Sequence, residues 1–389
     1  MAKTICNKCK IVFDQKVHEL CPCCGSHKHL YNFQNSDDRL KQEAAEIKEF
    51  RKKTGLEGLT GGLEALIINT EPERQKASVR EFLQYTGLEL TDLFEDTESR
   101  TSVLKTANSA DFLVRSRKKS SNPFKAFNNR PKSRNLPNTR LETFVFKTSD
   151  LKAYISLQKS QGIEFLTDDL IETDHYYFIQ TPPSAFTGLS YGFVQWKGEE
   201  RNYRNAESQS LGWIFQKPDN PYSRNIKWID HAATRVRAEN RDDAILEFMR
   251  LTSYNFEFAI YVKLLNTITN VARLTDKDFA MVFTSGIKKY KDEKFSGPTE
   301  KFIHNYGRRV HHMAFHTENI EETYRKIKQD GMGFLIELVG SPEQGLKQTF
   351  TQASENTLLV NEYIHRFGDF DGFFTKDNVT ELTRATEKQ

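Results

Sequence analysis

The sequence contains Thr148-Ser-Asp-Leu151 ahead of an apolar-periodic segment that reaches Gly162-Ile-Glu-Phe165, and Thr317-Glu-Asn-Ile320 ahead of a similar segment that reaches Gly331-Met-Gly-Phe334. In each copy the opening Thr, Ser or Asp is typical of a helix N-cap, and the glycine is typical of a helix end. The residues before each cap alternate between apolar and polar, as in a strand. The sequence therefore predicts two copies of a strand–helix–strand unit.

A second pair of repeats extends this pattern. Glu81-Phe-Leu-Gln-Tyr-Thr86 and Glu247-Phe-Met-Arg-Leu-Thr252 each follow one strand-like run and precede another. Such internal similarity indicates duplicated supersecondary units. We predict an α+β fold with two homologous modules, over residues 58–225 and 226–389, each built from two half-units. A polar stretch before them predicts a helical connector over residues 36–57.

The composition is that of a globular protein with more than one core. With 389 residues, of which 37% are hydrophobic, the chain is too long for a single ordinary core. The formal net charge of +3 is too small to attract the whole molecule to nucleic acid or to an anionic membrane. No apolar run approaches the roughly 20 residues that cross a bilayer, and the N-terminus lacks a secretory signal. We therefore expect a soluble, cytoplasmic protein without a membrane partner, able to form oligomers.

All five cysteines lie between Cys6 and Cys24, which argues against a secreted disulfide framework. Cys6-Asn-Lys-Cys9 and Cys21-Pro-Cys-Cys24 have the spacing at which four thiolates hold one tetrahedral Zn(II) ion. We predict a small zinc ribbon over residues 1–35, with a structural zinc ion bound by Cys6, Cys9, Cys21 and Cys24. A redox role is the alternative, and Cys23 could replace a neighbouring ligand.

A basic segment over residues 115–140 interrupts the first module. It is rich in Arg, Lys, Ser, Asn and Pro, and no acidic residue occurs between Asp111 and Glu142. We predict a loop or disordered insert. One interpretation is a weak binding site for nucleic acid or an acidic partner, with Phe124 and Phe127 stacking on bases. The alternative, a solvated basic loop, is the more common role of such charge runs.

Two histidines of the second module occupy corresponding strands. His231 lies in Trp228-Ile-Asp-His-Ala-Ala-Thr-Arg-Val236, where alternation puts it on one face with Ala233 and Arg235. His312 lies in Val310-His-His-Met-Ala-Phe-His316, where alternation separates it from His311. A lone histidine on a strand is usually a hydrogen-bonded core residue. Two histidines at matching places of a duplicated module instead indicate a shared site.

Glu362 shares a strand face with Val360 and Ile364, and a buried carboxylate among aliphatic side chains needs a cation or a metal. Two imidazoles and one carboxylate from three strands are typical of non-haem Fe(II) oxygenases, whose metal keeps positions open for substrate and O2. We predict that His231, His312 and Glu362 bind Fe(II). The alternative is an ion pair between Glu362 and an arginine such as Arg235 or Arg273.

The first module provides an internal control. Its corresponding strands carry Glu64, Glu142-Thr143 and the region of Gln195, and they contain no pair of histidines. We therefore expect the first module to be a scaffold and the second to contain the site.

Residues 58–389 resemble a known family, and five motifs in the second module carry the resemblance. They are Asp230-His231, Val310-His-His312-Met-Ala314, Leu346-Lys-Gln-Thr-Phe350-Thr, Glu362-Tyr-Ile-His-Arg366 and Phe374-Thr-Lys-Asp-Asn378. In order and location they are similar to those of 4-hydroxyphenylpyruvate dioxygenases, two-module members of the vicinal oxygen chelate superfamily. The resemblance implies two tandem modules of βαβββ half-units, to which the zinc ribbon and the basic segment are additions.

The resemblance also implies a chemistry. His231, His312 and Glu362 would be the iron ligands, and a C-terminal helix would gate a substrate pocket formed by Gln348, Phe350, His311, Phe374 and Asn378. The substrates would be a 2-oxo acid and O2, and the reaction an oxidative decarboxylation with hydroxylation of the same molecule. Val379 stands where the family has an aromatic residue, and His311 stands where it has a glutamine.

Two other interpretations stay open on the sequence. Extradiol dioxygenases and glyoxalase-type isomerases of the same superfamily use similar ligands. The zinc ribbon and the basic segment would also fit a protein that binds nucleic acid or a partner and whose oxygenase-like module is inactive.

Overall fold

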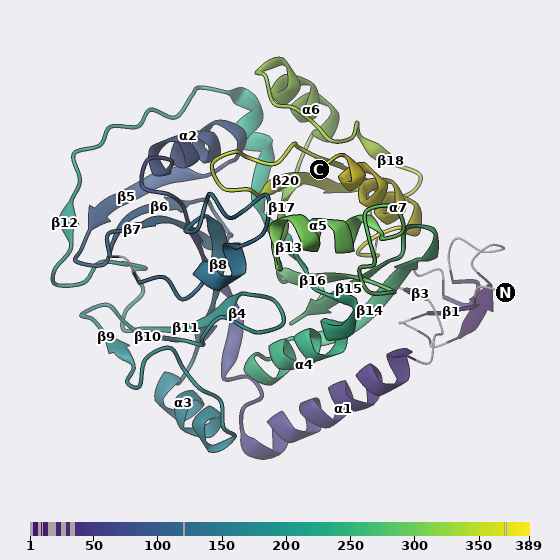
Figure 1. The fold of residues 1–389 in the computed structure, drawn as a ribbon, viewed down its shortest axis with the longest axis horizontal. Helices are drawn as coiled ribbons and strands as arrows, with labels where there is room; N and C mark the ends of the chain where they lie inside the picture. Colours follow the sequence, from purple (N-terminus) through teal and green to yellow (C-terminus); the bar gives the residue numbers. More distant parts are fainter. Residues whose placement is uncertain are drawn as a thin grey trace.

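The computed structural model describes residues 3–6, 9, 11–14, 21–24, 29–31, 36–119, 121–368, 370 and 372–389. Within them, a sheet at the left of Figure 1 and a sheet at its right form the bulk of the molecule. A small antiparallel sheet of β1 (Lys3–Cys6), β2 (Val12–Asp14) and β3 (His29–Tyr31) lies at the N-terminus, in the order β2-β1-β3. Of the predicted ribbon, residues 1–2, 7–8, 10, 15–20, 25–28 and 32–35 lie outside the described residues.

The first large sheet follows the order β12-β5-β6-β7-β4-β8-β11-β10-β9. Its strands are β4 (Thr60–Asn69), β5 (Glu89–Glu95), β6 (Ser99–Lys105), β7 (Asp111–Arg117), β8 (Arg140–Thr148), β9 (Ile171–Glu172), β10 (Tyr176–Gln180), β11 (Ser190–Trp196) and β12 (Gln209–Ser210).

The second large sheet follows the order β14-β15-β16-β13-β17-β20-β19-β18. Its strands are β13 (Ile226–Arg235), β14 (Asn255–Val262), β15 (Thr267–Arg273), β16 (Ala280–Gly286), β17 (Arg309–Thr317), β18 (Val339–Ser341), β19 (Leu346–Phe350) and β20 (Val360–Arg366).

Helices connect and cover the strands. The α-helices are α1 (Ser36–Thr54), α2 (Gln75–Tyr85), α3 (Leu151–Ser160), α4 (Arg241–Leu251), α5 (Pro298–Tyr306), α6 (Ile320–Gln329) and α7 (Lys376–Ala385). Short 3-10 helices are η1 (Lys125–Asn128), η2 (Pro221–Asn225), η3 (Ala238–Asn240), η4 (Lys263–Leu265) and η5 (Thr386–Lys388).

The two large sheets have the same topology. In the first, β4 is parallel to β7 and antiparallel to β8; in the second, β13 is parallel to β16 and antiparallel to β17. Each sheet thus consists of two βαβββ half-units joined at their first strands. The predicted α+β fold with tandem modules is confirmed. Within the connector predicted over residues 36–57, helix α1 spans Ser36–Thr54.

The predicted helix signals are confirmed with one difference. The Asp150 side chain accepts a hydrogen bond from the Ala153 amide at 2.9 Å and caps α3, whereas Asn319, before α6, makes no side-chain cap. Gly162 and Gly331 follow these helices at φ +78° and +93°, conformations that favour glycine. The residues after each glycine form no strand; the next strands are β9 and β18.

One apolar core joins the two modules. The rings of Phe112 and Phe315, one from each module, stack 5.9 Å apart, and those of Phe146 and Phe248 lie 5.7 Å apart. Each sheet also encloses an apolar interior of its own. This arrangement fixes the second sheet against the first.

Helix α1 is clamped to the second module beside α4 (Figure 1). The buried Arg51 guanidinium donates from Nη1 to the backbone oxygens of Met249, Thr252 and Tyr254, at 2.9, 2.7 and 2.8 Å. Its Nε lies 2.7 Å from Glu57. A charged donor thereby satisfies carbonyls at the C-terminal end of α4.

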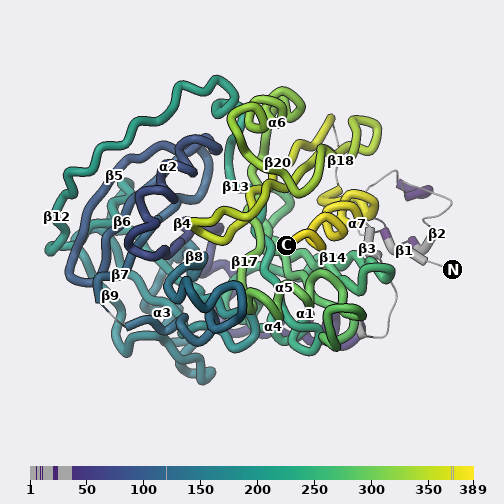
Figure 2. Tube along the Cα trace, turned by 45° about the horizontal axis from the view of Figure 1, so that its top comes forward, coloured from purple at the N-terminus to yellow at the C-terminus, as the bar shows by residue number. Residues whose placement is uncertain are grey.

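The long connection between the modules, residues 197–225, runs around the outer edge of the first sheet (Figures 1 and 2), where β12 pairs with β5. Within the described residues, no helix is both long and apolar enough to span a membrane.

The basic segment is folded onto the modules rather than extended away from them. Phe124 is only 1% exposed, and its ring lies 5.9 Å from the Arg140 guanidinium. The Phe127 ring packs against Arg140 and Arg308. Phe124 is therefore closed to base stacking, and nucleic-acid binding through residues 115–140 stays a prediction.

Candidate metal centre

Three neighbouring strands bring His231, His312 and Glu362 together. His231 on β13 and Glu362 on β20 both pair with Ala314 of the intervening strand β17, and His312 lies two residues before Ala314. The three residues therefore share one face, and the small Ala314 leaves room between them. The Glu362 Oε2 atom lies 3.1 Å from His231 Nε2 and 3.3 Å from His312 Nε2. This convergence is suited to a metal ion.

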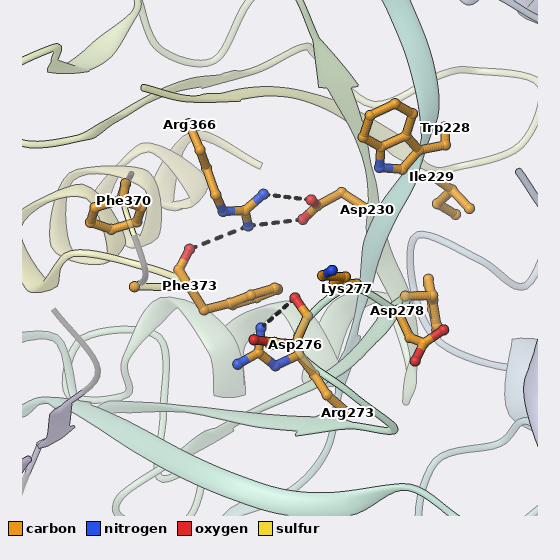
Figure 3. Close-up of a pocket in the computed structure, with 12 residues that line it drawn as sticks. Trp228, Ile229, Asp230, Arg273, Asp276, Lys277, Asp278, Arg366, Phe370 and Phe373 are labelled. Carbon is orange, nitrogen blue, oxygen red and sulfur yellow. Dashed lines mark hydrogen bonds and ion pairs between the residues drawn. The ribbon is translucent and has the colours of Figure 1, made fainter. Parts of the chain in front are cut away.

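The His231 ring is oriented by Asp230, which contacts the ring nitrogen that does not face Glu362. Its Nδ1 lies 2.8 Å from the Asp230 carboxylate, which itself receives two hydrogen bonds from Arg366, at 2.5 and 3.0 Å (Figure 3). An Nδ1–H donated to Asp230 leaves the Nε2 lone pair free to bind a metal. Burial alone would lower the pKa of His231, but the carboxylates of Glu362 and Asp230 outweigh it and raise that pKa above its ordinary value.

The His312 ring has a different support. Its Nδ1 lies 2.8 Å from the Nδ1 of His311, whose Nε2 lies 2.7 Å from Gln389 Oε1. If His312 Nδ1 donates to His311 Nδ1, His311 must donate from Nε2 to Gln389, and His312 Nε2 remains free as a ligand. Burial lowers the pKa of both histidines, which keeps the rings neutral, as this relay requires.

A β-bulge explains why two successive histidines meet. Ala233 pairs with His312 and Thr234 with Val310, so His311 is an extra residue on β17. The sequence prediction that His311 and His312 point to opposite faces is wrong for this reason. His311 supports the candidate ligand from behind and does not line the cavity described below.

The predicted alternative, an ion pair between Glu362 and an arginine, is absent from the described residues. Arg273 instead binds Glu257 through two 2.5 Å contacts, and Arg235 has no acidic partner there. Glu362 is 1% exposed, its Oε1 has no hydrogen-bond partner, and burial raises its pKa. A buried carboxylate without a guanidinium fits a cation held between it and the two imidazoles.

A cavity of about 40 Å³ adjoins two of the three residues, His312 and Glu362. Three residues predicted to bind substrate line it: Gln348, Phe350 and Phe374. The Phe350 ring lies 4.6 Å from the His312 ring, and the Phe374 ring lies 5.1 Å from the His231 ring. Asn378, on α7, does not line it; the amide nitrogen of its side chain lies 3.5 Å from the Leu346 carbonyl of β19.

Sequence reasoning missed most of the remaining lining. These residues are Arg235, Thr267, Thr269, Val282, Thr284, Thr299, Val379, Leu382 and Thr383. The threonines come from β15, β16, α5 and α7, which are far apart in the sequence. The sequence contained one indication for Arg235, the alternation that places it on the same face of β13 as His231.

A larger, charged cavity of about 200 Å³ is lined by Asp230, Arg273 and Arg366, among other residues (Figure 3). The Phe373 ring is placed between Arg366 and Arg273, 4.8 and 5.1 Å from their guanidinium groups, and it also packs against His231. Phe373 thus shields the back of the His231 ring, and neither His312 nor Glu362 lines this cavity.

The first module shows the same strand positions without ligands. Ala65, Val145 and Gly192 pair across its strands as His231, Ala314 and Glu362 do in the second module, and Thr143 corresponds to His312. The expected absence of a histidine pair therefore holds at these positions.

The acidic and amide residues that the sequence offered there serve other roles. Glu64 accepts a hydrogen bond from Trp196, and Glu142, at a bulge equivalent to that of His311, binds Arg117. Gln195 caps α3 by accepting from the Leu151 amide.

The N-terminal cysteines form a second cluster. Cys6 Sγ lies 3.5 Å from Cys24 Sγ, and Cys9 Sγ lies 3.4 Å from Cys21 Sγ, too far apart for disulfides. Sulfur atoms around a tetrahedral zinc ion, with bonds of about 2.3 Å, lie about 3.8 Å apart. The four thiols therefore fit one zinc ion, and the exposed Cys23 lies outside their group.

No protein-family model matches this sequence, and a search of curated proteins gives no match. Among solved structures, a mutant of 4-hydroxymandelate synthase from Streptomyces coelicolor superposes with a TM-score of 0.63 at 15% identity, covering 85% of this chain and 98% of that one. A xylose isomerase-like TIM barrel/4-hydroxyphenylpyruvate dioxygenase fusion protein gives a TM-score of 0.59 at 13% identity over 85% of this chain. This chain spans about half of that fusion protein, 52%. At these identities the likeness concerns the fold, which is that of tandem vicinal oxygen chelate modules.

Proposed function

We propose that this protein is an Fe(II)-dependent dioxygenase of the vicinal oxygen chelate superfamily that acts on a 2-oxo acid. The observation that carries the proposal is the convergence of His231 Nε2 and His312 Nε2 on Glu362 Oε2, at 3.1 and 3.3 Å, beside a cavity. Iron bound there would offer open positions to O2 and to the 2-oxo acid, and would supply the electrons that activate O2.

The reaction balances within one substrate molecule. Cleavage of the C1–C2 bond releases CO2, and one oxygen atom of O2 enters the new carboxylate. The second oxygen atom becomes a hydroxyl group on the rest of the molecule. Decarboxylation and hydroxylation each supply two electrons, which together reduce O2 without another reductant.

The surrounding residues would hold the ligands and the substrate. Asp230 and His311 fix the imidazole tautomers, so that both Nε2 atoms face the metal. Phe350 and Phe374 exclude water beside the ligands, and the Gln348 amide, whose oxygen and nitrogen have no partner, is free to bind substrate. Asn378 would act indirectly, by positioning α7 over the cavity.

The N-terminal cluster has a separate role in this proposal. Cys6, Cys9, Cys21 and Cys24 bind zinc structurally, because so short a segment cannot fold by apolar burial alone.

The test is an anaerobic titration of the purified protein with Fe(II) and a panel of 2-oxo acids, with the visible charge-transfer band of the chelate as readout. A saturable band in the parent protein, absent from His312→Ala, supports the proposal. Ring cleavage of catechols with no 2-oxo acid band would support an extradiol enzyme instead. Zinc without any iron uptake would support a binding protein with an inactive module.

A further inference from the structure

Arg235 is a buried cation without an anion. It follows His231 and Ala233 on the same face of β13, is 4% exposed and lines the cavity beside His312 and Glu362. Its Nη1 donates to Thr299 Oγ1 at 2.6 Å, and its guanidinium lies 5.4 Å from the Phe302 ring. Its Nε has no hydrogen-bond partner, and no carboxylate of the described chain forms an ion pair with it.

Such a group is costly to bury. Arginine does not give up its proton in proteins, and an unpaired charge away from water is strongly unfavourable. Burial lowers the pKa of Arg235 to about 9, with no acid to oppose the shift. Arg51 contacts Glu57 at 2.7 Å, and Arg241 contacts Asp37 at 2.9 Å. Arg140 and Arg309 are buried without an ion pair to a described residue, but they donate to backbone or amide oxygens and do not line the cavity. Arg235 differs from these arginines because its unpaired guanidinium lines the cavity beside His312 and Glu362.

The cavity has two chemically different ends. His312 and Glu362 form one end, and Arg235 with the threonine hydroxyls of Thr267 and Thr299 forms the other. Because β-strands rise about 3.3 Å per residue, the Cα atoms of His231 and Arg235 lie about 13 Å apart. Since the Arg235 side chain lines the same cavity as His312 and Glu362, one ligand bound there can contact both ends.

We propose that Arg235 binds a second carboxylate at the far end of the substrate, so that the substrate is a dicarboxylic 2-oxo acid. This inference rests on the proposed function. The charges of Fe(II), Glu362 and the chelating carboxylate sum to zero, which leaves Arg235 as the unbalanced charge among the residues that line the cavity. One carboxylate neutralises it, whereas a dianionic phosphate would leave an excess. The planar guanidinium edge that carries the unbonded Nε also matches two carboxylate oxygens.

The proposal is tested by anaerobic calorimetry on the iron-loaded protein, with probes that differ only at the far end. These are 2-oxoglutarate, its 5-amide and 2-oxopentanoate, with the six-carbon series in parallel. The dicarboxylate is expected to bind about 10- to 100-fold more tightly than its neutral counterparts, the range of a charge-assisted hydrogen bond. In Arg235→Met this preference should fall below about 3-fold, while iron content stays that of the parent.

Two matched variants complete the design. Arg325→Gln, at an exposed arginine on α6, should keep the full preference. Arg235→Met should also melt no lower than the parent after chelator treatment, because it removes an uncompensated buried charge. If that variant fails to fold, the comparison of probes in the parent decides alone.

The outcomes separate the two proposals. Equal affinity of the parent for dicarboxylate, amide and monocarboxylate would overturn the role of Arg235 while leaving the dioxygenase proposal standing. A parent that takes up iron but binds no 2-oxo acid would overturn both.

Discussion

Replacing Glu362 by glutamine separates a metal ligand from a structural ion pair, because the variant keeps the shape of the side chain and loses only its charge. In this structure the carboxylate faces two imidazoles and no guanidinium. We therefore expect Glu362→Gln to lose iron. Its metal-free stability should change by no more than the charge-assisted hydrogen bond to His231, about 1.5–3 kcal/mol. An ion pair with a buried arginine would instead cost about 3–5 kcal/mol.

The pH dependence sharpens this expectation. Because Glu362 and Asp230 raise the pKa of His231, its stabilising contribution is fully present below the ordinary imidazole pKa and is lost as pH rises through the raised value. The metal-free variant should thus be less stable than the parent at pH 7 and equally or more stable near pH 10, where His231 is neutral. Loss of an arginine pair would persist at both pH values.

The assay combines iron content after anaerobic reconstitution with melting temperatures in the presence of a chelator at pH 7 and pH 10. For the second module, residues 226–389, a loss of about 3–5 kcal/mol corresponds to a fall in melting temperature of roughly 6–20 °C. Full iron occupancy in Glu362→Gln, together with a fall of that size at both pH values, would refute the metal site.

Three further predictions concern other parts of the chain. Cys9→Ser should lose zinc and keep iron, whereas Cys23→Ser should keep both metals; loss of iron from Cys9→Ser would contradict two separate sites. Arg51→Met should destabilise the protein to urea by about 3–5 kcal/mol, because it leaves buried carbonyls of α4 unpaired. Burial raises the pKa of Glu247 to about 7 from 4.5, so stability should fall by up to about 3 kcal/mol as pH rises from 5 to 8.5. Glu247→Gln should flatten this dependence, and an unchanged slope would contradict the raised pKa.

The tandem modules and the meeting of the three candidate ligands could be predicted because repeats and alternation are local signals. Period-two alternation correctly put Glu362 on a buried face, and the repeat correctly related the strands of His231 and His312. Both inferences need only the sequence within one strand and its copy.

Other features depend on register between strands, which the sequence does not reveal. The bulge that brings His311 behind His312 adds one residue to β17, so alternation assigned the wrong face. In the first module, the positions equivalent to His231 and Glu362 are Ala65 and Gly192, whereas the sequence drew attention to the nearby Glu64 and Gln195. Arg235 was considered a partner for Glu362, but its isolation from every described carboxylate appears only in three dimensions.

The close packing around Gly192 limits how far the first module, which lacks the candidate ligands, could be engineered into a second metal site. A Cβ atom there would meet the Phe178 ring at 3.0 Å and Val145 at 3.1 Å, because aromatic side chains fill the space that is a cavity in the second module. Grafting His, His and Glu onto Ala65, Thr143 and Gly192 would therefore not create a second iron centre. The graft would first require the half-buried Phe178 to be truncated, which would cost packing against its neighbours. The same backbone fold therefore has a packed interior in the first module and a cavity in the second. The side chains that fill the interior of the first module prevent it from taking over the role of the second.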